Sequence, residues 1–276
     1  MGTKHYLILG DCRNMNEISS DSVQLVVTSP PYYNAPFDYK DKYKSYEDYL
    51  DLLKDVAQEL YRVLEKGRIV VLNIDDMLVN GIKYPIVADS TKIFQNSGFK
   101  YRDRIIWKKP DDYLRILHRR EVIYKFPYPM YFYPDNLLES ILIFQKGDFD
   151  YKSIQYNVKL ASKIDIDDFN QKQLYKTLWE FRNVMPGSDL EKGIAAFPED
   201  IPERFIKLFS YVGDTVLDPF CGSGTTLKVS RRLGRNSIGI EKEKSLIPII
   251  TKKLGIIPDE TKRTDENDLI VIDRDS

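Results

Sequence analysis

The chain has 276 residues, with 41 Lys and Arg residues against 42 Asp and Glu residues, so its formal net charge is −1. A hydrophobic content of 42% beside 30% charged residues excludes a wholly disordered chain, and no apolar run approaches the roughly 18 residues that a membrane helix needs. Two cysteines and two histidines are too few for a disulfide framework or a four-cysteine zinc site, so we expect no metal centre. The N-terminus carries no secretory signal pattern, and we expect a cytoplasmic enzyme that contacts no membrane.

Charge is distributed unevenly along this nearly neutral chain. Residues 100–125 carry nine basic and four acidic side chains, whereas residues 257–276 carry three basic and seven acidic ones. A local basic patch can bind phosphate even on a neutral protein, so the basic stretch is compatible with nucleic acid. The acidic tail predicts a solvated surface.

Strand-like and helix-like segments alternate along the chain, which predicts one α/β domain over residues 1–276, with a mainly parallel sheet covered by helices on both faces. In chain order, we predict strands at 23–27, 68–74, 101–107, 140–145, 215–217 and 237–240, and helices at 46–64, 85–97, 202–211 and 224–233. The helix at 46–64 has apolar residues at three-four spacing, with Ser45 as its N-cap and Gly67 at its end.

Two long segments lack a regular pattern. In residues 110–134, prolines alternate with aromatic residues, and we expect an excursion from the sheet. We expect its rings to pack the loop, and the alternative is that they wedge against nucleic acid. Residues 148–195 are polar and irregular, and we expect an insertion there.

A glycine-containing motif lies where the predicted strand 215–217 ends and a helix begins. It reads Asp218-Pro219-Phe220-Cys221-Gly222-Ser223-Gly224-Thr225-Thr226, and Glu241 closes the next strand. Glycines let a ligand approach the backbone, and an acidic residue ending the second strand can accept hydrogen bonds from two ribose hydroxyls. Position 227 is Leu where a dinucleotide site requires a third glycine, and the Gly-Lys-Ser/Thr of a phosphate loop is absent. The pattern predicts an adenosine-like ligand without a pyrophosphate.

A second motif, Thr28-Ser29-Pro30-Pro31-Tyr32, follows the predicted strand 23–27. The two prolines fix the backbone and remove amide donors, which leaves carbonyl oxygens free to accept. A serine hydroxyl and such a carbonyl together can accept hydrogen bonds from both hydrogens of an amino group. The Tyr32 ring offers a face on which a planar base can stack. A rigid turn with a surface aromatic residue is the alternative interpretation of this motif alone.

Together and in this order, the two motifs resemble those of the β-class DNA amino-methyltransferases. The resemblance implies a Rossmann-like S-adenosyl-L-methionine-dependent methyltransferase with circularly permuted motif order, the catalytic motif preceding the cofactor motif, and with target recognition in residues 148–195. It covers nearly the whole chain, and the segments that resemble the family further are Gly10-Asp11-Cys12, Ile106-Trp107-Lys108-Lys109, Glu139 to Gly147, Phe197-Pro198-Glu199 and Arg204-Phe205-Ile206. The family often has His-Pro before Phe-Pro, where this chain has Gly193-Ile194-Ala195-Ala196.

The resemblance also implies roles for single residues. The Ser29 hydroxyl and the Pro30 carbonyl would hold the target amine, Tyr32 would stack on the flipped base, Glu241 would bind the ribose and Asp11 the adenine amine. The implied catalytic residues are Ser29, Pro30, Pro31 and Tyr32, and the implied cofactor site comprises Asp11, Cys12, Asp218, Phe220, Cys221, Gly222, Gly224, Thr225, Thr226 and Glu241.

The first residue of the catalytic motif bears on the target base. In the family, Ser-Pro-Pro-Tyr goes most often with methylation of cytosine N4, whereas Asp or Asn in place of Ser goes with adenine N6. We therefore expect cytosine N4 in double-stranded DNA, with adenine N6 as the alternative. Methylation of cytosine C5 requires a nucleophilic cysteine, normally after proline, and neither Cys12 nor Cys221 follows one.

Phosphate contacts require basic side chains beside the pocket, and the basic stretch supplies Lys108, Lys109, Arg115, Arg119 and Arg120 as candidates. We expect a member of a restriction–modification system, with a homodimer and a separately acting cognate restriction endonuclease as further partners. Methylation of a protein glutamine or an RNA amine, and DNA binding without a cofactor, are alternatives from other classes.

Overall fold

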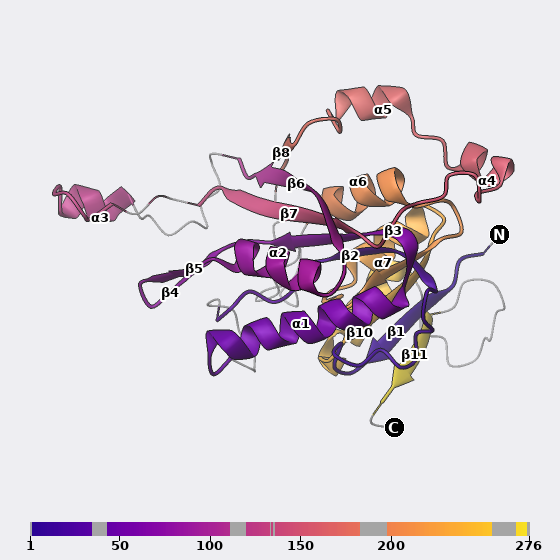
Figure 1. The fold of residues 1–276 in the computed structure, drawn as a ribbon, viewed down its shortest axis with the longest axis horizontal. Helices are drawn as coiled ribbons and strands as arrows, with labels where there is room; N and C mark the ends of the chain where they lie inside the picture. The colour runs from indigo at the N-terminus through magenta and orange to yellow at the C-terminus, as the bar shows by residue number, and fades with distance from the viewer. Residues whose placement is uncertain are drawn as a thin grey trace.

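A nine-stranded sheet forms the centre of the computed structural model, which describes residues 2–34, 43–110, 120–132, 134, 136–182, 198–255 and 269–274 (Figure 1). The strand order is β11-β1-β10-β9-β2-β3-β7-β6-β8. Neighbouring strands run parallel, except that β7 runs antiparallel to β3 and β6. The strands are β1 (His5–Leu9), β2 (Val23–Thr28), β3 (Leu64–Ile74), β6 (Lys100–Lys108), β7 (Leu138–Gln145), β8 (Leu178–Glu180), β9 (Thr215–Asp218), β10 (Asn236–Glu241) and β11 (Leu269–Asp273). A separate antiparallel pair joins β4 (Met77–Val79) and β5 (Ile82–Tyr84).

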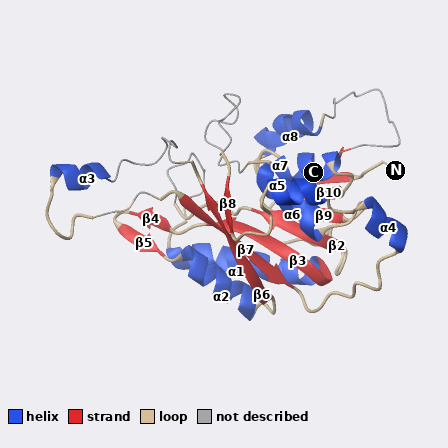
Figure 2. Cartoon of the chain, turned by 90° about the horizontal axis from the view of Figure 1, so that it is seen from above, coloured by secondary structure: helices blue, strands red, loops and turns tan. Residues whose placement is uncertain are grey.

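Helices cover both faces of the sheet, as the sequence predicts (Figure 2). Side chains alternate along each strand, so Val26 and Val70 pack with α1 (Tyr46–Val63) and α2 (Ile86–Asn96) on one face. Val27 and Val71 pack on the other face with α6 (Asp200–Phe209) and α7 (Thr225–Arg232), and α8 (Ile247–Leu254) extends that layer over β1. None of the described helices is both long enough and apolar enough to span a membrane.

The start of α1 follows the prediction, but its end does not. Ser45 accepts a hydrogen bond from the Asp48 amide, and the Asp48 carboxylate accepts one from the Ser45 amide, which completes a capping box. The helix ends at Val63 because Leu64 is already extended and pairs with β2. Gly67 therefore lies inside β3, and the predicted helix end there is wrong.

Two neighbouring parallel strands at one side of the sheet, β1 and β11, escape the sequence prediction. β1 lies between β10 and β11. The described end of the acidic tail is β11, a strand that the sequence analysis did not predict. Ile270 and Val271 are exposed and no residue of β11 is buried, so this part of the tail is a solvated surface as expected. Both strands have five residues, too few for a periodic pattern to stand out.

Part of the predicted insertion is regular. It contains α4 (Tyr156–Ala161), α5 (Ile166–Gln171) and the edge strand β8. Trp179 of β8 is buried, and the Trp107 indole donates to the Phe181 carbonyl at 3.0 Å and stacks on the Phe181 ring. The segment that follows β7 thus returns to the sheet beside β6.

Residues 120–132 leave the sheet as expected, but their rings do not pack a loop. The short helix α3 (Arg120–Lys125) lies far from the sheet in Figure 1. Tyr124, Tyr128 and Phe132 are exposed, and Phe126 and Tyr131 stack on each other while remaining exposed. The expectation that the aromatic residues pack the loop is wrong for the described part of this excursion.

Candidate active site

The functional residues gather at one edge of the sheet, because neighbouring parallel strands end on the same side. From β1 to β3, each strand along this edge is parallel to the next, and the antiparallel β7 begins where β3 ends. Following the strand order, the edge presents Asp11, Glu241, the loop after Asp218, the motif after Thr28, Asn73 and Glu139.

A crevice is expected at the centre of this edge, between β9 and β2. The helix after β2, α1, packs on one face of the sheet, whereas the helix after β9, α7, packs on the other. The loops after the two strands therefore diverge, and such a switch point is where open α/β sheets bind ligands. The structure brings residues 29–32 and 219–224 to the two sides of this point.

Asp218 joins the two motifs. Its carboxylate accepts hydrogen bonds from the hydroxyls of Thr28 and Thr226, each at 2.7 Å, and from the Phe220 amide at 3.2 Å. The side chain is buried, and burial raises its pKa to about 6 against the lowering effect of these hydrogen bonds. The protein itself encloses this carboxylate, so we interpret Asp218 and Thr226 as residues that position the cofactor loop.

Glu241 supports the glycine loop from the neighbouring strand. One carboxylate oxygen accepts from the Gly222 amide at 2.9 Å, and the other accepts from the Lys242 and Glu243 amides at 2.9 Å. Burial raises the pKa of Glu241, although these amide hydrogen bonds oppose the rise. The side chain keeps partial solvent exposure, which leaves the carboxylate able to accept from a ligand.

The first turn of α7 completes this half of the site. Gly224, its N-cap, has a φ of +81°, a conformation that glycine adopts without strain. Thr225 and Cys221 are buried, as is Cys12 in the loop after β1, and burial raises the pKa values of both thiols. These three side chains therefore shape the loops from inside.

The residues at the ends of β1 and β10 fit an adenosine. Asp11 is exposed, and its carboxylate is paired with Arg13 at 2.6 Å, which lowers the pKa of Asp11 and keeps it ionised. Asp11 and Glu241 thus offer two separate acceptors on adjacent strands, as an adenine amine and a ribose require.

The catalytic half of the site contains a network that the sequence did not predict. The Glu139 carboxylate accepts from the Tyr32 hydroxyl at 2.9 Å and from the Asn73 amide at 2.8 Å. The same Asn73 nitrogen lies 3.4 Å from the Ser29 hydroxyl, and Lys109 pairs with Glu139 at 2.5 Å. Asn73 and Glu139 are buried. The only signal of them in the sequence is a polar residue inside, or just before, a predicted apolar strand.

This network fixes the aromatic residue of the catalytic motif. Burial and the neighbouring Glu139 raise the pKa of Tyr32 well above its usual value, so the hydroxyl stays protonated and donates. The next residue, Tyr33, is buried against the rings of Tyr46 and Tyr84. The hydrogen bond of Tyr32 with Glu139 and the burial of Tyr33 both restrict the motion of this motif, as the predicted stacking of a base on Tyr32 would require.

Of the predicted phosphate-binding residues, only Lys108 and Lys109 have described side chains, and each pairs with a carboxylate. Lys109 differs from its prediction, because its ammonium group pairs with the buried Glu139 and lies 5.4 Å from the centre of the Trp107 ring. This ion pair places Lys109 inside the site, next to the network around Glu139. Lys108 lies 3.7 Å from Glu180. Arg115 and Arg119 lie outside the described residues, as does the side chain of Arg120.

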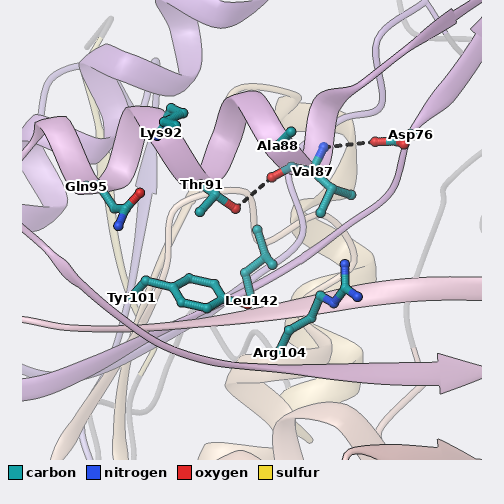
Figure 3. Close-up of a pocket in the computed structure, with 9 residues that line it drawn as sticks. All are labelled: Asp76, Val87, Ala88, Thr91, Lys92, Gln95, Tyr101, Arg104 and Leu142. Atoms are coloured by element: carbon teal, nitrogen blue, oxygen red, sulfur yellow. Dashed lines mark hydrogen bonds between the residues drawn. The ribbon is translucent and has the colours of Figure 1, made fainter.

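A cavity of about 520 Å³ lies away from this edge, between α2 and the strands β6 and β7 (Figure 3). Its polar groups include Asp76, which accepts from the Val87 amide at 2.9 Å, and Thr91, which donates to the Val87 carbonyl at 2.8 Å. These hydrogen bonds belong to the first turns of α2, and we assign the cavity no function.

Comparison with known proteins indicates the family to which the chain is similar. A family model described as DNA methylase matches residues 23–252. The type II methyltransferase M.MjaI of Methanocaldococcus jannaschii is 35% identical over 92% of this chain and 92% of its own length. The type II methyltransferase M.BglII of Bacillus subtilis is 31% identical over 91% of this chain and 69% of its own length.

Solved structures of DNA methyltransferases and of a related protein have a similar fold. The protein TTHA0409 of Thermus thermophilus, solved in complex with S-adenosyl-L-methionine, has a TM-score of 0.71 and 27% identity, covering 96% of this chain and 99% of its own. The cytosine-N4-specific PvuII DNA methyltransferase has a TM-score of 0.66 and 18% identity, covering 95% and 89%. The latter likeness concerns the fold alone.

Proposed function

The chain belongs to the DNA methylase family, and from that premise we propose that it methylates the exocyclic N4 amine of cytosine in a specific duplex sequence. It is an S-adenosyl-L-methionine-dependent DNA amino-methyltransferase of the restriction–modification type. The choice of cytosine N4 rests on Ser29, the first residue of the Ser-Pro-Pro-Tyr sequence. This residue lies at the switch point, beside the loop that follows Asp218.

The cofactor supplies an electrophilic methyl group when it is bound. Glu241 would bind the ribose hydroxyls and Asp11 the adenine amine, while Gly222 and Gly224 let the ligand approach the backbone. The partly exposed Phe220 would pack against it. Because Asp218 ties this loop to Thr28, the cofactor site and the Ser29 motif keep a fixed separation.

Ser29 and Pro30 would activate the target amine. An aromatic amine is a poor nucleophile, because its lone pair is delocalised into the ring. Two acceptors that hold its hydrogens, the Ser29 hydroxyl and the Pro30 carbonyl, would favour a pyramidal nitrogen and stabilise the positive charge that develops on it. Alignment of this nitrogen with the methyl donor would supply much of the rate.

The buried network would orient these groups. Asn73 approaches the Ser29 hydroxyl with its amide nitrogen, which directs a lone pair of that hydroxyl and leaves the other for the substrate. Glu139 holds Asn73 and Tyr32 at once, so the acceptor and the stacking ring move together. The ion pair of Glu139 with Lys109 anchors this network to the end of β6.

DNA would approach the edge that carries the site. A base inside a duplex cannot reach this pocket, so we propose that the target is flipped at a cost of a few kcal/mol, with Tyr32 stacking on it. The chain between β6 and β7 begins next to Lys109, and its described residues 120–132 lie outside the sheet. We propose that residues 110–134 face the DNA. Recognition of the sequence would fall to residues 148–195. A homodimer and a separate restriction endonuclease remain proposals by family resemblance.

The test is nucleoside mass spectrometry of unmethylated duplex DNA after incubation with the protein and isotopically labelled S-adenosyl-L-methionine. Label in N4-methylcytosine, lost in Ser29→Ala, is the expected result. Label in N6-methyladenine would overturn the choice of base while retaining the site. No label in DNA, with the cofactor still bound, would overturn the DNA substrate in favour of a protein or RNA amine.

A further inference from the structure

The loop after β1 (residues 10–18), here called the adenine loop, is held by an arginine at the far end of the chain. Arg274 follows β11, and one of its terminal nitrogens donates to the Asp11 carbonyl at 2.6 Å. The other donates to the Asn14 carbonyl and to the Glu17 carboxylate, and Nε donates to the same carboxylate at 2.7 Å. One guanidinium thus bridges three points of a loop that has no helix or strand of its own.

Gly10 makes room for this arginine. A Cβ atom at position 10 would lie 2.6 Å from the Arg274 Cδ, and the Gly10 φ of +154° disfavours other residues. The Gly10 amide donates to the Glu241 carbonyl at 2.9 Å, so the same short stretch also contacts the strand that carries the ribose acceptor. Arg274 therefore packs directly against the backbone that aims Asp11 and Glu241.

We propose that Arg274 is a positioning residue for the cofactor, and that docking of β11 is coupled to cofactor binding. The proposal rests on the adenine role of Asp11 given above. Without the arginine, the carbonyls of Asp11 and Asn14 and the Glu17 carboxylate lose the group that joins them, and the Asp11 carbonyl keeps only the longer hydrogen bond from the Asn14 amide, at 3.3 Å. The adenine loop then has to be ordered when the ligand binds. That ordering cost weakens binding, and by linkage the bound cofactor stabilises the docked β11 by the same factor.

A second arginine provides a matched control on the other half of the loop. Arg62 of α1 donates to the carbonyls of Met15 and Ile18 at 2.8 Å and pairs with Glu59 at 2.7 Å. Like Arg274, it bridges two carbonyls and one carboxylate. It holds the part of the loop that leads to β2, away from Asp11, so its loss removes similar hydrogen bonds without releasing the predicted adenine acceptor.

The experiment measures the affinity of the full-length chain for S-adenosyl-L-methionine by isothermal titration calorimetry, with Tm recorded for each variant. Arg274→Ala is expected to weaken binding about tenfold, which corresponds to about 1.4 kcal/mol, because the adenine loop must then be ordered when the cofactor binds. Gly10→Ala, which displaces the arginine, is expected to weaken binding likewise, and Arg274→Lys to weaken it less. Arg62→Ala is expected to lower Tm with less than a twofold effect on affinity.

Hydrogen exchange supplies a readout that is independent of activity. Bound S-adenosyl-L-methionine is expected to slow exchange of the β11 amides in the native chain and not in Arg274→Ala. Equal losses of affinity in Arg274→Ala and Arg62→Ala, or unchanged affinity in Arg274→Ala, would overturn the proposal. Native chain that does not bind the cofactor at all would instead overturn the cofactor assignment, so the two failures are distinguishable.

Discussion

The Thr28 hydroxyl donates to the Asp218 carboxylate at 2.7 Å, across 190 positions of sequence. Thr28 is the last residue of β2 and precedes the Ser29 motif, while Asp218 is the last residue of β9 and precedes the glycine loop. Both side chains are buried. The hydrogen bond therefore fixes the distance between the predicted catalytic and cofactor motifs.

Thr28→Val is expected to destabilise the fold by about 1–3 kcal/mol, because it removes a donor from a buried carboxylate while keeping the shape of the side chain. Urea unfolding measures this loss. Thr91→Val is the matched control: its hydroxyl bonds only to the Val87 carbonyl one turn earlier in α2, and its loss should cost about 0.5 kcal/mol or less. Equal losses in the two variants would contradict a special role for the pair.

Asp218 also predicts a pH dependence of stability. Its pKa is raised from the ordinary 3.8 to about 6 in the folded state, chiefly by burial, so the folded chain binds this proton more tightly than the unfolded chain. The contribution of Asp218 to the free energy of unfolding therefore falls as pH rises from about 4 to about 6, by up to about 3 kcal/mol for a shift of this size. Burial lowers the pKa of His5 to about 4, so His5 contributes a rise over nearly the same range, and the contribution of Asp218 is the difference between the profiles of the native chain and of a variant at that position. Asp218→Asn is expected to remove this contribution.

Asp75 is a second group that contributes to the same pH dependence, because burial also raises its pKa to about 6. Asp75→Asn is expected to remove a separate part of the same fall, and the double variant should remove more than either. The measurement is the free energy of unfolding by urea at intervals between pH 4 and pH 7. A profile that Asp218→Asn leaves unchanged is incompatible with the assignment.

The central fold was predictable because its elements carry their signals locally. The helix α1 has an apolar face, an N-cap serine and a capping box within 19 residues, and β2 ends at two prolines that no ladder can continue through. By contrast, β1 and β11 become strands only by pairing with each other and with β10. Neither strand has a local signal strong enough to identify it.

The residues of the candidate site likewise include some that the sequence predicts and some that it does not. Ser29, Tyr32 and Glu241 stand at strand ends in recognisable motifs, and the sheet brings those ends to one edge. The pairing of Glu139 with Lys109 depends on β7 running antiparallel between β3 and β6, which places the start of β7 beside the end of β6. No local pattern contains that relationship, so a lysine predicted for phosphate instead contacts the catalytic network.

Gly239→Ala is expected to destabilise the cofactor half by about 1–3 kcal/mol through overpacking. The added Cβ would lie 2.9 Å from the Cys221 sulfur and 2.9 Å from a methyl group of Leu227. Urea unfolding of Gly239→Ala, of Cys221→Ala and of the double variant forms a cycle that isolates this contact. The double variant should recover part of the loss, and strictly additive losses would show that the sulfur does not oppose the new methyl group.

Glu139→Gln is expected to lower kcat at least tenfold while the affinity for S-adenosyl-L-methionine stays unchanged. The substitution leaves Lys109 without its anionic partner and weakens the hydrogen bonds from Tyr32 and Asn73, so the stacking ring and the amine acceptor lose their alignment. Single-turnover methylation of duplex DNA gives the rate of transfer, and calorimetry gives the cofactor affinity.

The chain offers a matched control for this change in the neighbouring pair. Glu180 lies 3.7 Å from Lys108 on the exposed edge strand β8, so Glu180→Gln removes the same charge from an adjacent Lys–Glu pair outside the network. An exposed pair of this kind contributes at most about 1 kcal/mol, and we expect kcat to stay within about twofold of the native value. Equal losses of kcat in the two variants would trace the effect to the charge of this edge, whereas a loss confined to Glu139→Gln identifies Glu139 as the residue that aligns Tyr32 and Ser29.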